Sequence, residues 1–307
     1  MVDNKLFKDV VEEWKTNKKQ YVKKSTYAAY QLLIQNHILP VFGEKEVICE
    51  ADVQSFALKK LEQGLSEKTI KDIIIVLKMI IKYAIKCGYL DYVQIDVKFP
   101  SNQQKKELEV LSKSDQKKFM NYLRDNFTFK NLGIFICLST GMRIGEICGL
   151  RWQDVDVDEG VIMVRHTLQR IYILDEGVKH TELLLDTPKT SNSVRDIPMS
   201  SELLKIMKQF NKVVNDDYYV ISNDINPIEP RTYRNYYKKL CKKLELPELK
   251  FHGLRHSFAT RCIESNGDYK TVSVLLGHSN ISTTLNLYVH PNKEQKKKLI
   301  NKMLKSL

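Results

Sequence analysis

Three short segments of this sequence concentrate the residue types that bind anions and transfer protons. In the first, Arg143 and Glu146 follow Gly141, which is expected to end one helix and let the next begin. Arg143 is therefore predicted in the first turn of a helix, on the same face as Glu146. Taken alone, this pair is more typical of an ordinary ion pair on a helix surface than of a catalytic site.

The second segment is a predicted helix that contains His252, Arg255 and His256. Two histidines four residues apart are also the spacing of zinc ligands on the helix of a metallohydrolase. Gly253 stands where the glutamate base of such an enzyme would be, and Arg255 would repel a cation. No third ligand is indicated by a motif, so a zinc hydrolase is a minor alternative that inhibition by a chelator would reveal.

The third segment places a histidine and a tyrosine ten residues apart. His278 follows Gly277 at an expected helix end, and Tyr288 lies in a short helix that begins near Ser282. One of 15 tyrosines is by itself more often a packing residue than a nucleophile. Taken together with the arginines and histidines of the other segments, it has few such ordinary explanations.

The composition agrees with a globular protein that has a polyanionic partner. The 307 residues include 49 Lys+Arg and 37 Asp+Glu, a formal net charge of +12, and 43% are hydrophobic, which excludes disorder and collagen-like repeats. Residues 1–100 hold 16 Lys+Arg and 13 Asp+Glu, so the remainder carries +9. A field of this sign is typical of nucleic-acid binding.

The sequence contains neither a recognisable targeting segment nor a cysteine motif. No apolar stretch reaches the roughly 18 to 20 residues of a membrane span, and the N-terminus lacks the pattern of a secretory signal, so a cytoplasmic protein is expected. The cysteines contain no CxxC pair and lie in apolar runs, which predicts reduced core residues and neither disulfides nor a zinc ribbon. They are Cys49, Cys87, Cys137, Cys148, Cys241 and Cys262.

The elements that must position these residues fall into two predicted domains, giving a mainly α fold with a small antiparallel sheet. Residues 1–97 are expected to form a four-helix bundle, and the polar, proline-containing residues 98–108 a linker. Residues 109–307 are expected to form a mixed α/β domain. Its predicted elements are helices over 114–127, 131–139 and 142–150, strands over 161–165, 168–174, 183–187 and 194–198, and mostly helix from 200 onward.

Taken in order, the sequence blocks resemble the tyrosine recombinases, the family of phage and conjugative-transposon integrases and chromosome dimer resolvases. The blocks are TGMRIGEICGLRWQDVD at 140–156, TPKT at 187–190, HGLRH at 252–256, LGHS at 276–279, and Tyr288. The resemblance covers nearly the whole chain, and the ordered set is far more specific than any one block. It implies a SAM-like core-binding domain over 1–97 and a catalytic domain over 109–307.

The activity that this resemblance implies is site-specific recombination through a 3′-phosphotyrosine intermediate and a Holliday junction, for integration or excision of a mobile element. Arg143 and Arg255 would bind the scissile phosphate, and Tyr288 would attack it. His252 is the candidate base or proton relay. His278 would stabilise the transition state by a hydrogen bond to the phosphate.

Two further residues complete the implied site. Lys189, expected on a hairpin turn between two strands, would protonate the leaving 5′-hydroxyl. Glu146 would orient Arg143 or the histidines from behind, while His256 and His290 stay outside the catalytic set. No cofactor is implied: the phosphotyrosine keeps the bond energy, and the sequence shows neither a Walker A motif nor the carboxylates of a two-metal nuclease.

Double-stranded DNA is the expected partner, contacted through basic residues that give affinity more than sequence choice. The candidates are Lys18, Lys19, Lys23, Lys24, Arg231, Arg234, Lys238 and Lys239. A tail helix over 292–307 carries an apolar stripe that either packs within the chain or docks on a neighbour in a tetramer, and the resemblance favours docking. Its residues are Leu299, Ile300, Met303, Leu304 and Leu307.

Other activities of the same architecture stay open at this point. They include a chromosome or plasmid dimer resolvase, a non-catalytic DNA-binding regulator and a type IB topoisomerase. The bundle begins near residue 5, which leaves no room for the arm-binding domain of larger integrases. A naturally short enzyme, a relative without arm sites and a truncated chain all fit this. Excision or architectural proteins are expected as accessory partners at the bacterial nucleoid.

Overall fold

The structure is a computed structural model that describes residues 5–100, 108–175, 178–211, 213–288 and the single positions 297, 300, 301, 303 and 304. At 175, 211, 287 and 288 only the backbone is described. The chain forms two compact units, Met1–Lys105 with Ile171–Glu182, and Lys106–Arg170 with Leu183–Leu307. No helix in the described part is long and apolar enough to cross a bilayer.

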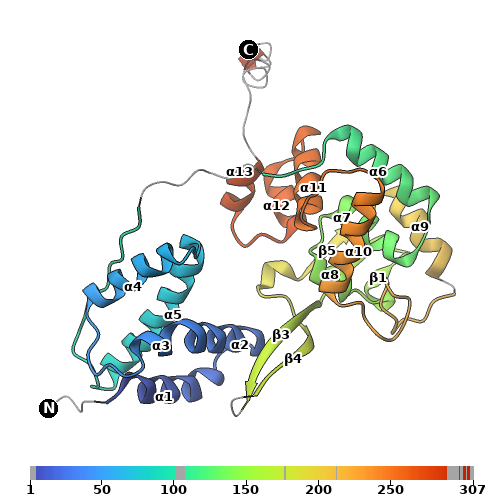
Figure 1. Ribbon diagram of the computed structural model, residues 1–307. Coiled ribbons are helices and arrows are strands. Elements are labelled where there is room, and N and C mark those ends of the chain that lie inside the picture. The colour runs from blue at the N-terminus through green and yellow to red at the C-terminus, as the bar shows by residue number, and fades with distance from the viewer. Residues whose placement is uncertain are drawn as a thin grey trace. The chain divides into compact units, whose positions relative to one another are not determined.

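The N-terminal unit is built around a helical bundle (Figure 1). Its helices are α1 (Phe7–Lys19), α2 (Lys24–Leu33), α3 (Leu39–Phe42), α4 (Glu50–Glu62) and α5 (Glu67–Lys86). The predicted second helix does not stop at α2 but continues through a π-helical turn, Ile34–Ile38, into α3. Pro40, at the start of α3, has no N–H and cannot donate to the carbonyl four residues back. The π-helical turn lies directly before this missing hydrogen bond.

Helix α5 supplies the largest apolar face of the bundle. Ser66 caps it by accepting a hydrogen bond from the Thr69 N–H at 3.1 Å, and the chain leaves it at Gly88 with φ +77°. Its buried face repeats at helical spacing through Ile73, Leu77 and Ile80. The predicted helix and its end are therefore confirmed.

The predicted linker, residues 98–108, falls mostly outside the described residues, which stop at 100 and resume at 108. At the start of the predicted linker, the Gln54 side chain in α4 accepts a hydrogen bond from the Lys98 N–H at 2.9 Å and donates one to the Lys98 carbonyl at 3.1 Å. Lys98 is thus still tied to the bundle.

The C-terminal unit is mainly helical, with α7 at its centre (Figure 1). Its helices are α6 (Lys113–Asp125), α7 (Phe129–Thr140), α8 (Ile144–Cys148), α9 (Ser201–Asn211), α10 (Pro230–Lys243), α11 (His252–Glu264), α12 (Tyr269–Leu276) and α13 (Ile281–Tyr288). Nearly every residue of α7 is buried, and α8 and α11 pack directly against it.

Two small sheets complete the fold. Strands β1 (Val155–Asp156), β2 (Val161–Val164) and β5 (Arg195–Pro198) form one antiparallel sheet in the order β1-β2-β5, and β3 (Thr167–Asp175) with β4 (Val178–Asp186) forms a separate hairpin. The mainly α fold with small antiparallel sheets is as predicted. The start of β4 was predicted too late, at 183, because residues 178–181 are exposed and, after Val178, polar, so they show no apolar alternation.

The prediction that all six cysteines lie in the core is wrong for two of them. Every cysteine is free, but Cys49 and Cys87 are exposed. Cys49 lies directly before α4 and Cys87 directly after α5. At these helix ends, a residue that belongs to an apolar run in the sequence no longer lies on the buried face of the helix.

Candidate active site

The first sequence block forms the junction between α7 and α8. Gly141 ends α7 in the left-handed conformation, φ +69°, as predicted. Arg143 is not in the first turn of α8 but precedes it as the N-cap, with extended backbone. Its N–H donates to Glu146 Oε2 at 2.9 Å, so the carboxylate fixes the backbone from which the arginine side chain extends.

Glu146 is a buried acid and not the surface partner that its spacing alone suggested. It is 2% exposed and binds two guanidiniums: Arg143 Nη1 lies 2.7 Å from Oε1, and Arg195 donates to both oxygens at 3.1 and 2.9 Å. Burial acts to raise the pKa of Glu146, but the hydrogen bonds and charge of Arg195, followed by those of Arg143, outweigh it and hold the pKa below its usual range. The side chain is therefore an anion that orients both arginines.

Helix α11 contributes the second arginine and two histidines. Arg255 is 1% exposed and donates to the carbonyl oxygens of Gly141 at 2.8 Å and Leu276 at 2.7 Å. The His252 and His256 rings meet edge to face with centroids 4.5 Å apart. Among the residues that the structure describes, no group of three histidines, cysteines or acids gathers in metal-binding geometry.

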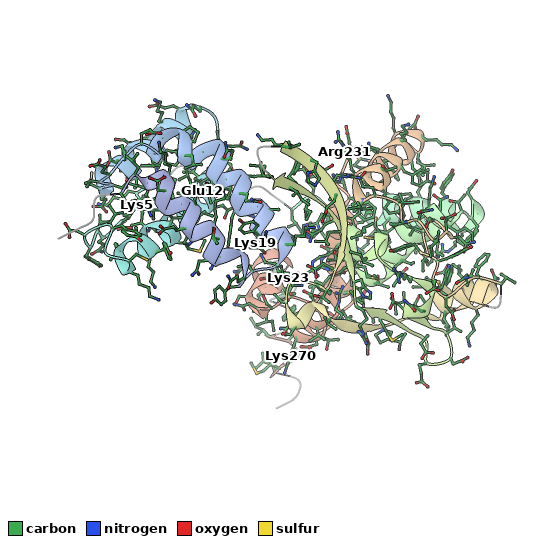
Figure 2. The ribbon with its side chains drawn as sticks, turned by 90° about the horizontal axis from the view of Figure 1, so that it is seen from below. Lys5, Glu12, Lys19, Lys23, Arg231 and Lys270 are labelled. Carbon is green, nitrogen blue, oxygen red and sulfur yellow. The ribbon has the colours of Figure 1, made fainter. Side chains whose placement is uncertain are left out.

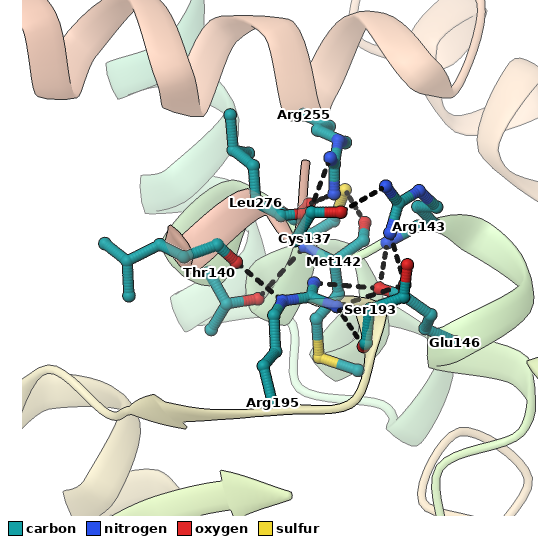
Figure 3. A network of polar contacts seen from close by, with 12 residues as sticks. Cys137, Thr140, Met142, Arg143, Glu146, Ser193, Arg195, Arg255 and Leu276 are labelled. Carbon is teal, nitrogen blue, oxygen red and sulfur yellow. Dashed lines mark hydrogen bonds and ion pairs between the residues drawn. The ribbon is translucent and has the colours of Figure 1, made fainter. Parts of the chain in front are cut away.

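The end of α12 joins the three sequence segments (Figure 3). The carbonyl oxygens of residues 275, 276 and 277 accept from three different arginines, at 2.7, 2.7 and 3.2 Å respectively. These donors are Arg195, Arg255 and Arg143. We call this arrangement of three arginines on the carbonyls of 275–277 the guanidinium cap. It is favourable because helix C-termini carry partial negative charge.

His278 follows the guanidinium cap directly. Gly277 ends α12 with φ +64°, and His278 Nδ1 lies 2.9 Å from the hydroxyl of the buried Thr284 in α13. Burial, followed by the charges of Arg255 and Arg143, lowers the pKa of His278 to about 4.

The pKa of His252 is lowered for similar reasons. Part of its side chain faces solvent, yet burial of the rest and the neighbouring charges of His256, Arg255 and Arg143 lower its pKa to about 4. Both histidine rings are therefore uncharged at pH 7.

Lys189 is exposed on the segment between β4 and β5. The predicted hairpin turn is wrong, because β4 pairs with β3 and β5 with β2, so the segment passes from one sheet to the other. The segment that carries Lys189 still contacts the guanidinium cap, because Arg195 Nη1 donates to the Ser193 carbonyl at 3.0 Å. It also packs closely against Gly277, where an added Cβ would lie 2.9 Å from the Asn192 carbonyl oxygen.

Tyr288 is the last residue of α13, a helix that packs on α12 and α11. Its side chain lies outside the described part of the structure, as do His290 and, in the predicted tail, Leu299 and Leu307. The described tail residues Ile300, Met303 and Leu304 are exposed.

The basic residues predicted to contact DNA belong to two groups, one in each unit (Figure 2). Near the turn from α1 to α2, Lys19 and Lys24 are exposed and Lys18 and Lys23 half-buried; Lys24 pairs with Glu182 at 2.5 Å. In α10, all four basic candidates are exposed while Tyr233 and Tyr237 face the core. They are Arg231, Arg234, Lys238 and Lys239.

Arg195 was not among the predicted site residues. The signal for it is the alternation of β5, in which Arg195 and Ile197 are buried while Asp196 and Pro198 are exposed. A strand arginine on the same face as a core isoleucine must be paired inside the protein.

Comparison with known proteins agrees with this site. Residues 107–295 match the model of the phage integrase family, and residues 6–61 match the N-terminal SAM-like domain of phage integrases. The chain belongs to the phage integrase family of tyrosine recombinases. It is a tyrosine recombinase like the integrases of conjugative transposons, as predicted.

Individual relatives of this recombinase are similar over most of their length. A tyrosine recombinase XerC-like protein of Caldanaerobacter subterraneus subsp. tengcongensis is 31% identical, covering 89% of this chain and 76% of the relative. The ICEBs1 integrase of Bacillus subtilis is 25% identical over the same shares. The solved structure of the Tn1549 transposon integrase in complex with circular intermediate DNA is 26% identical, with a TM-score of 0.73 over 97% of this chain and all of that one.

These relatives identify the activity of the class. This recombinase is an enzyme of site-specific recombination, of the mobile-element integrase kind. A dimer resolvase or a non-catalytic regulator is not favoured.

Proposed function

We propose that this recombinase cleaves DNA with Tyr288 while two arginines of the guanidinium cap, Arg143 and Arg255, bind the scissile phosphate. The observation that best supports this is that Arg143 and Arg255 donate to carbonyls 277 and 276, two successive acceptors at one helix end. The two guanidiniums are therefore neighbours, and a phosphate bound to one lies in the field of the other. His278 is the next residue in the chain after Gly277, so it lies beside these two carbonyls.

The two arginines differ in access, which suggests different tasks. Arg143 exposes 35% of its side chain and is available for a bidentate contact with the phosphate oxygens. Arg255 is almost fully buried, so its charge is poorly screened by water and stabilises the extra negative charge of the transition state from within.

In the proposed reaction, the Tyr288 oxygen bonds to phosphorus and the bond from phosphorus to the 5′ oxygen breaks. His252, neutral at pH 7, accepts the tyrosine proton, and Lys189 donates one to the leaving 5′ oxygen. His278 bonds a phosphate oxygen. Attack of another strand's 5′-hydroxyl on the phosphotyrosine reverses the step, forms a Holliday junction after the first exchange, and requires no cofactor.

The decisive test is replacement of the proposed nucleophile. Tyr288→Phe removes the attacking oxygen, so we expect no covalent protein–DNA product, while the dissociation constant for the duplex changes less than about 3-fold, since one hydroxyl is a small share of the interface. The measurement uses nicked suicide duplexes that span the ends of the encoding element, incubated in EDTA and resolved on denaturing gels.

The matched control is Tyr269→Phe, an exposed tyrosine at the start of α12, which should cleave as the wild type does. Cleavage retained by Tyr288→Phe, or a wild type that binds these ends without ever becoming attached, would contradict the proposal.

The proposed domain limits follow the sequence: a core-binding domain over 1–97, a linker over 98–108 and a catalytic domain over 109–307. We propose that the two basic groups contact DNA phosphates, Lys18, Lys19, Lys23 and Lys24 from the first domain and Arg231, Arg234, Lys238 and Lys239 from the second. Their exposure supports this for most of them.

We further propose that the tail over 292–307 docks on a neighbouring protomer and assembles a tetramer on two duplexes. The exposure of Ile300, Met303 and Leu304 supports this, because apolar side chains on one segment favour burial in a partner. Excision or architectural proteins would act as further partners, at the nucleoid in the bacterial cytoplasm.

Removal of residues 292–307 should therefore reduce assembly and strand exchange at least about 10-fold, the effect of losing one apolar anchor, while binding to a single duplex stays nearly unchanged. Native gels with one and two duplexes measure both, and Lys297→Ala, which keeps the apolar stripe, is the control. A truncated protein that still forms the full tetramer would exclude docking by the tail.

A further inference from the structure

Arg195 is the one member of the guanidinium cap that belongs to none of the sequence blocks of the catalytic set. It is buried, and four of its donor contacts are satisfied inside the protein: both oxygens of Glu146, the Ser193 carbonyl and the Leu275 carbonyl. A guanidinium bonded in this way is not directed at a ligand. Its effect must pass through the groups that it holds.

Those groups lie on three separate elements. Glu146 is in α8, Ser193 is in the segment that carries Lys189, and the Leu275 carbonyl is in the last turn of α12 just before His278. The planar fork of arginine is the side chain that matches several acceptors at fixed angles. A lysine ammonium keeps the charge but lacks this rigid geometry.

The contact with Glu146 also changes what Arg143 can do. The Glu146 carboxylate binds Arg143 through one oxygen and its backbone N–H through the other, while Arg195 bonds both oxygens. Without Arg195, the charge of the buried carboxylate would be balanced by Arg143 alone. The guanidinium that is exposed for phosphate would then be drawn toward Glu146.

We infer that Arg195 is a positioning residue of strand cleavage, which holds Glu146 in place so that the Arg143 guanidinium faces the scissile phosphate. This inference rests on the proposed function of Arg143. It assigns to Arg195 no contact with DNA and no proton transfer. The loss of Arg195 should therefore affect the step in which phosphate charge is neutralised, and leave DNA binding intact.

The test is Arg195→Lys, measured as the single-turnover rate of covalent attachment to nicked suicide duplexes at saturating protein. We expect cleavage to slow by roughly 100-fold, the scale of a misplaced catalytic group, with the duplex dissociation constant unchanged within about 3-fold. The second substrate carries one neutral methylphosphonate in place of the scissile phosphodiester. On it, the ratio of wild-type to variant rates should fall to below about 3, because Arg143 no longer has a full phosphate charge to neutralise.

A general structural role of Arg195 would slow both substrates by the same factor, and that result would overturn the inference, as would wild-type rates on the phosphodiester. If Arg195→Lys does not fold, Glu146→Gln breaks the same link from the other side and must show the same dependence on substrate charge. The control is Arg124→Lys in the exposed ion pair with Glu202, which should match the wild type on both substrates. Failure of the proposed function is recognised separately, as the absence of Tyr288-dependent attachment in the wild type.

Discussion

His252 and His278 share an unusual electrostatic setting, since burial and then nearby positive charges lower the pKa of each to about 4. In the unfolded chain a histidine has a pKa of about 6.5. Between these values the unfolded state binds more protons than the folded state. The stability that the neutral rings retain above about pH 6.5 is therefore lost as the pH falls toward 4.

His278→Gln should weaken this acid sensitivity. The free energy of unfolding, measured in urea at several pH values from 5 to 7, should depend less steeply on pH, by at most about 1.4 kcal/mol per pH unit, the limit for one proton. The control is His180→Gln on the exposed face of β4. An unchanged slope in His278→Gln would show that this ring does not stay neutral in the folded protein.

At the scale of residues, the motifs gave a predicted catalytic set and an orienting role for Glu146, but not all of the contacts that hold these side chains. The resemblance predicted Glu146 as a group that orients Arg143 or the histidines, but it gave no sign of the second partner of Glu146, Arg195, which comes from a strand 49 residues away. Pairings of this kind depend on tertiary packing. The burial pattern of β5 was the only local signal.

At the scale of elements, the end of α12 is the most constrained turn of the site. Gly277 combines a left-handed φ of +64° with close packing, since an added Cβ would lie 2.9 Å from the Asn192 carbonyl and 3.2 Å from Arg195. Only glycine satisfies both conditions without strain.

Gly277→Ala should therefore destabilise the protein by more than backbone strain alone, which costs about 1 kcal/mol, and should also slow cleavage. Gly64→Ala is the matched control, because Gly64 has φ +82° but nothing within 4 Å of an added Cβ. The difference in thermal stability between the two variants gives the free-energy cost of the steric clash at Gly277. Equal losses of stability in both would mean that the Asn192 segment moves aside freely.

The elements themselves were predicted well where apolar periodicity is strong, as in α5, and less well where it is absent. The polar outer half of β4 and the π-helical turn after α2 have no periodic signal. The segment of Lys189 was assigned to a hairpin because the strands on either side are consecutive in sequence. Strand pairing, which is not local, decides otherwise.

At the scale of the whole molecule, the net charge of +12 attracts DNA, while the cations that contact phosphates set the salt dependence of the affinity. In α10, the division between a buried tyrosine face and an exposed basic face turns part of that charge outward. If Arg231 and Arg234 each contact one phosphate, the double change to Gln should reduce the slope of log affinity against log salt by about 1.8. Fluorescence anisotropy over a salt series measures this slope.

The control for that experiment removes the same charge elsewhere, by Lys113→Gln with Arg124→Gln in α6, where both cations pair with acids. If the control lowers the slope as much as the α10 variant, net charge and not local contact sets the salt dependence.

The exposure of Cys49 and Cys87 gives the molecule a practical property. Burial raises the pKa of the four other thiols, Cys137, Cys148, Cys241 and Cys262, which suppresses the reactive thiolate. A maleimide dye should therefore attach to the two exposed sites at the ends of α4 and α5, both in the bundle. With Cys49→Ser, Cys87 alone becomes a fluorescent reporter on the N-terminal unit, and its energy transfer to labelled DNA would follow that unit through each round of strand exchange.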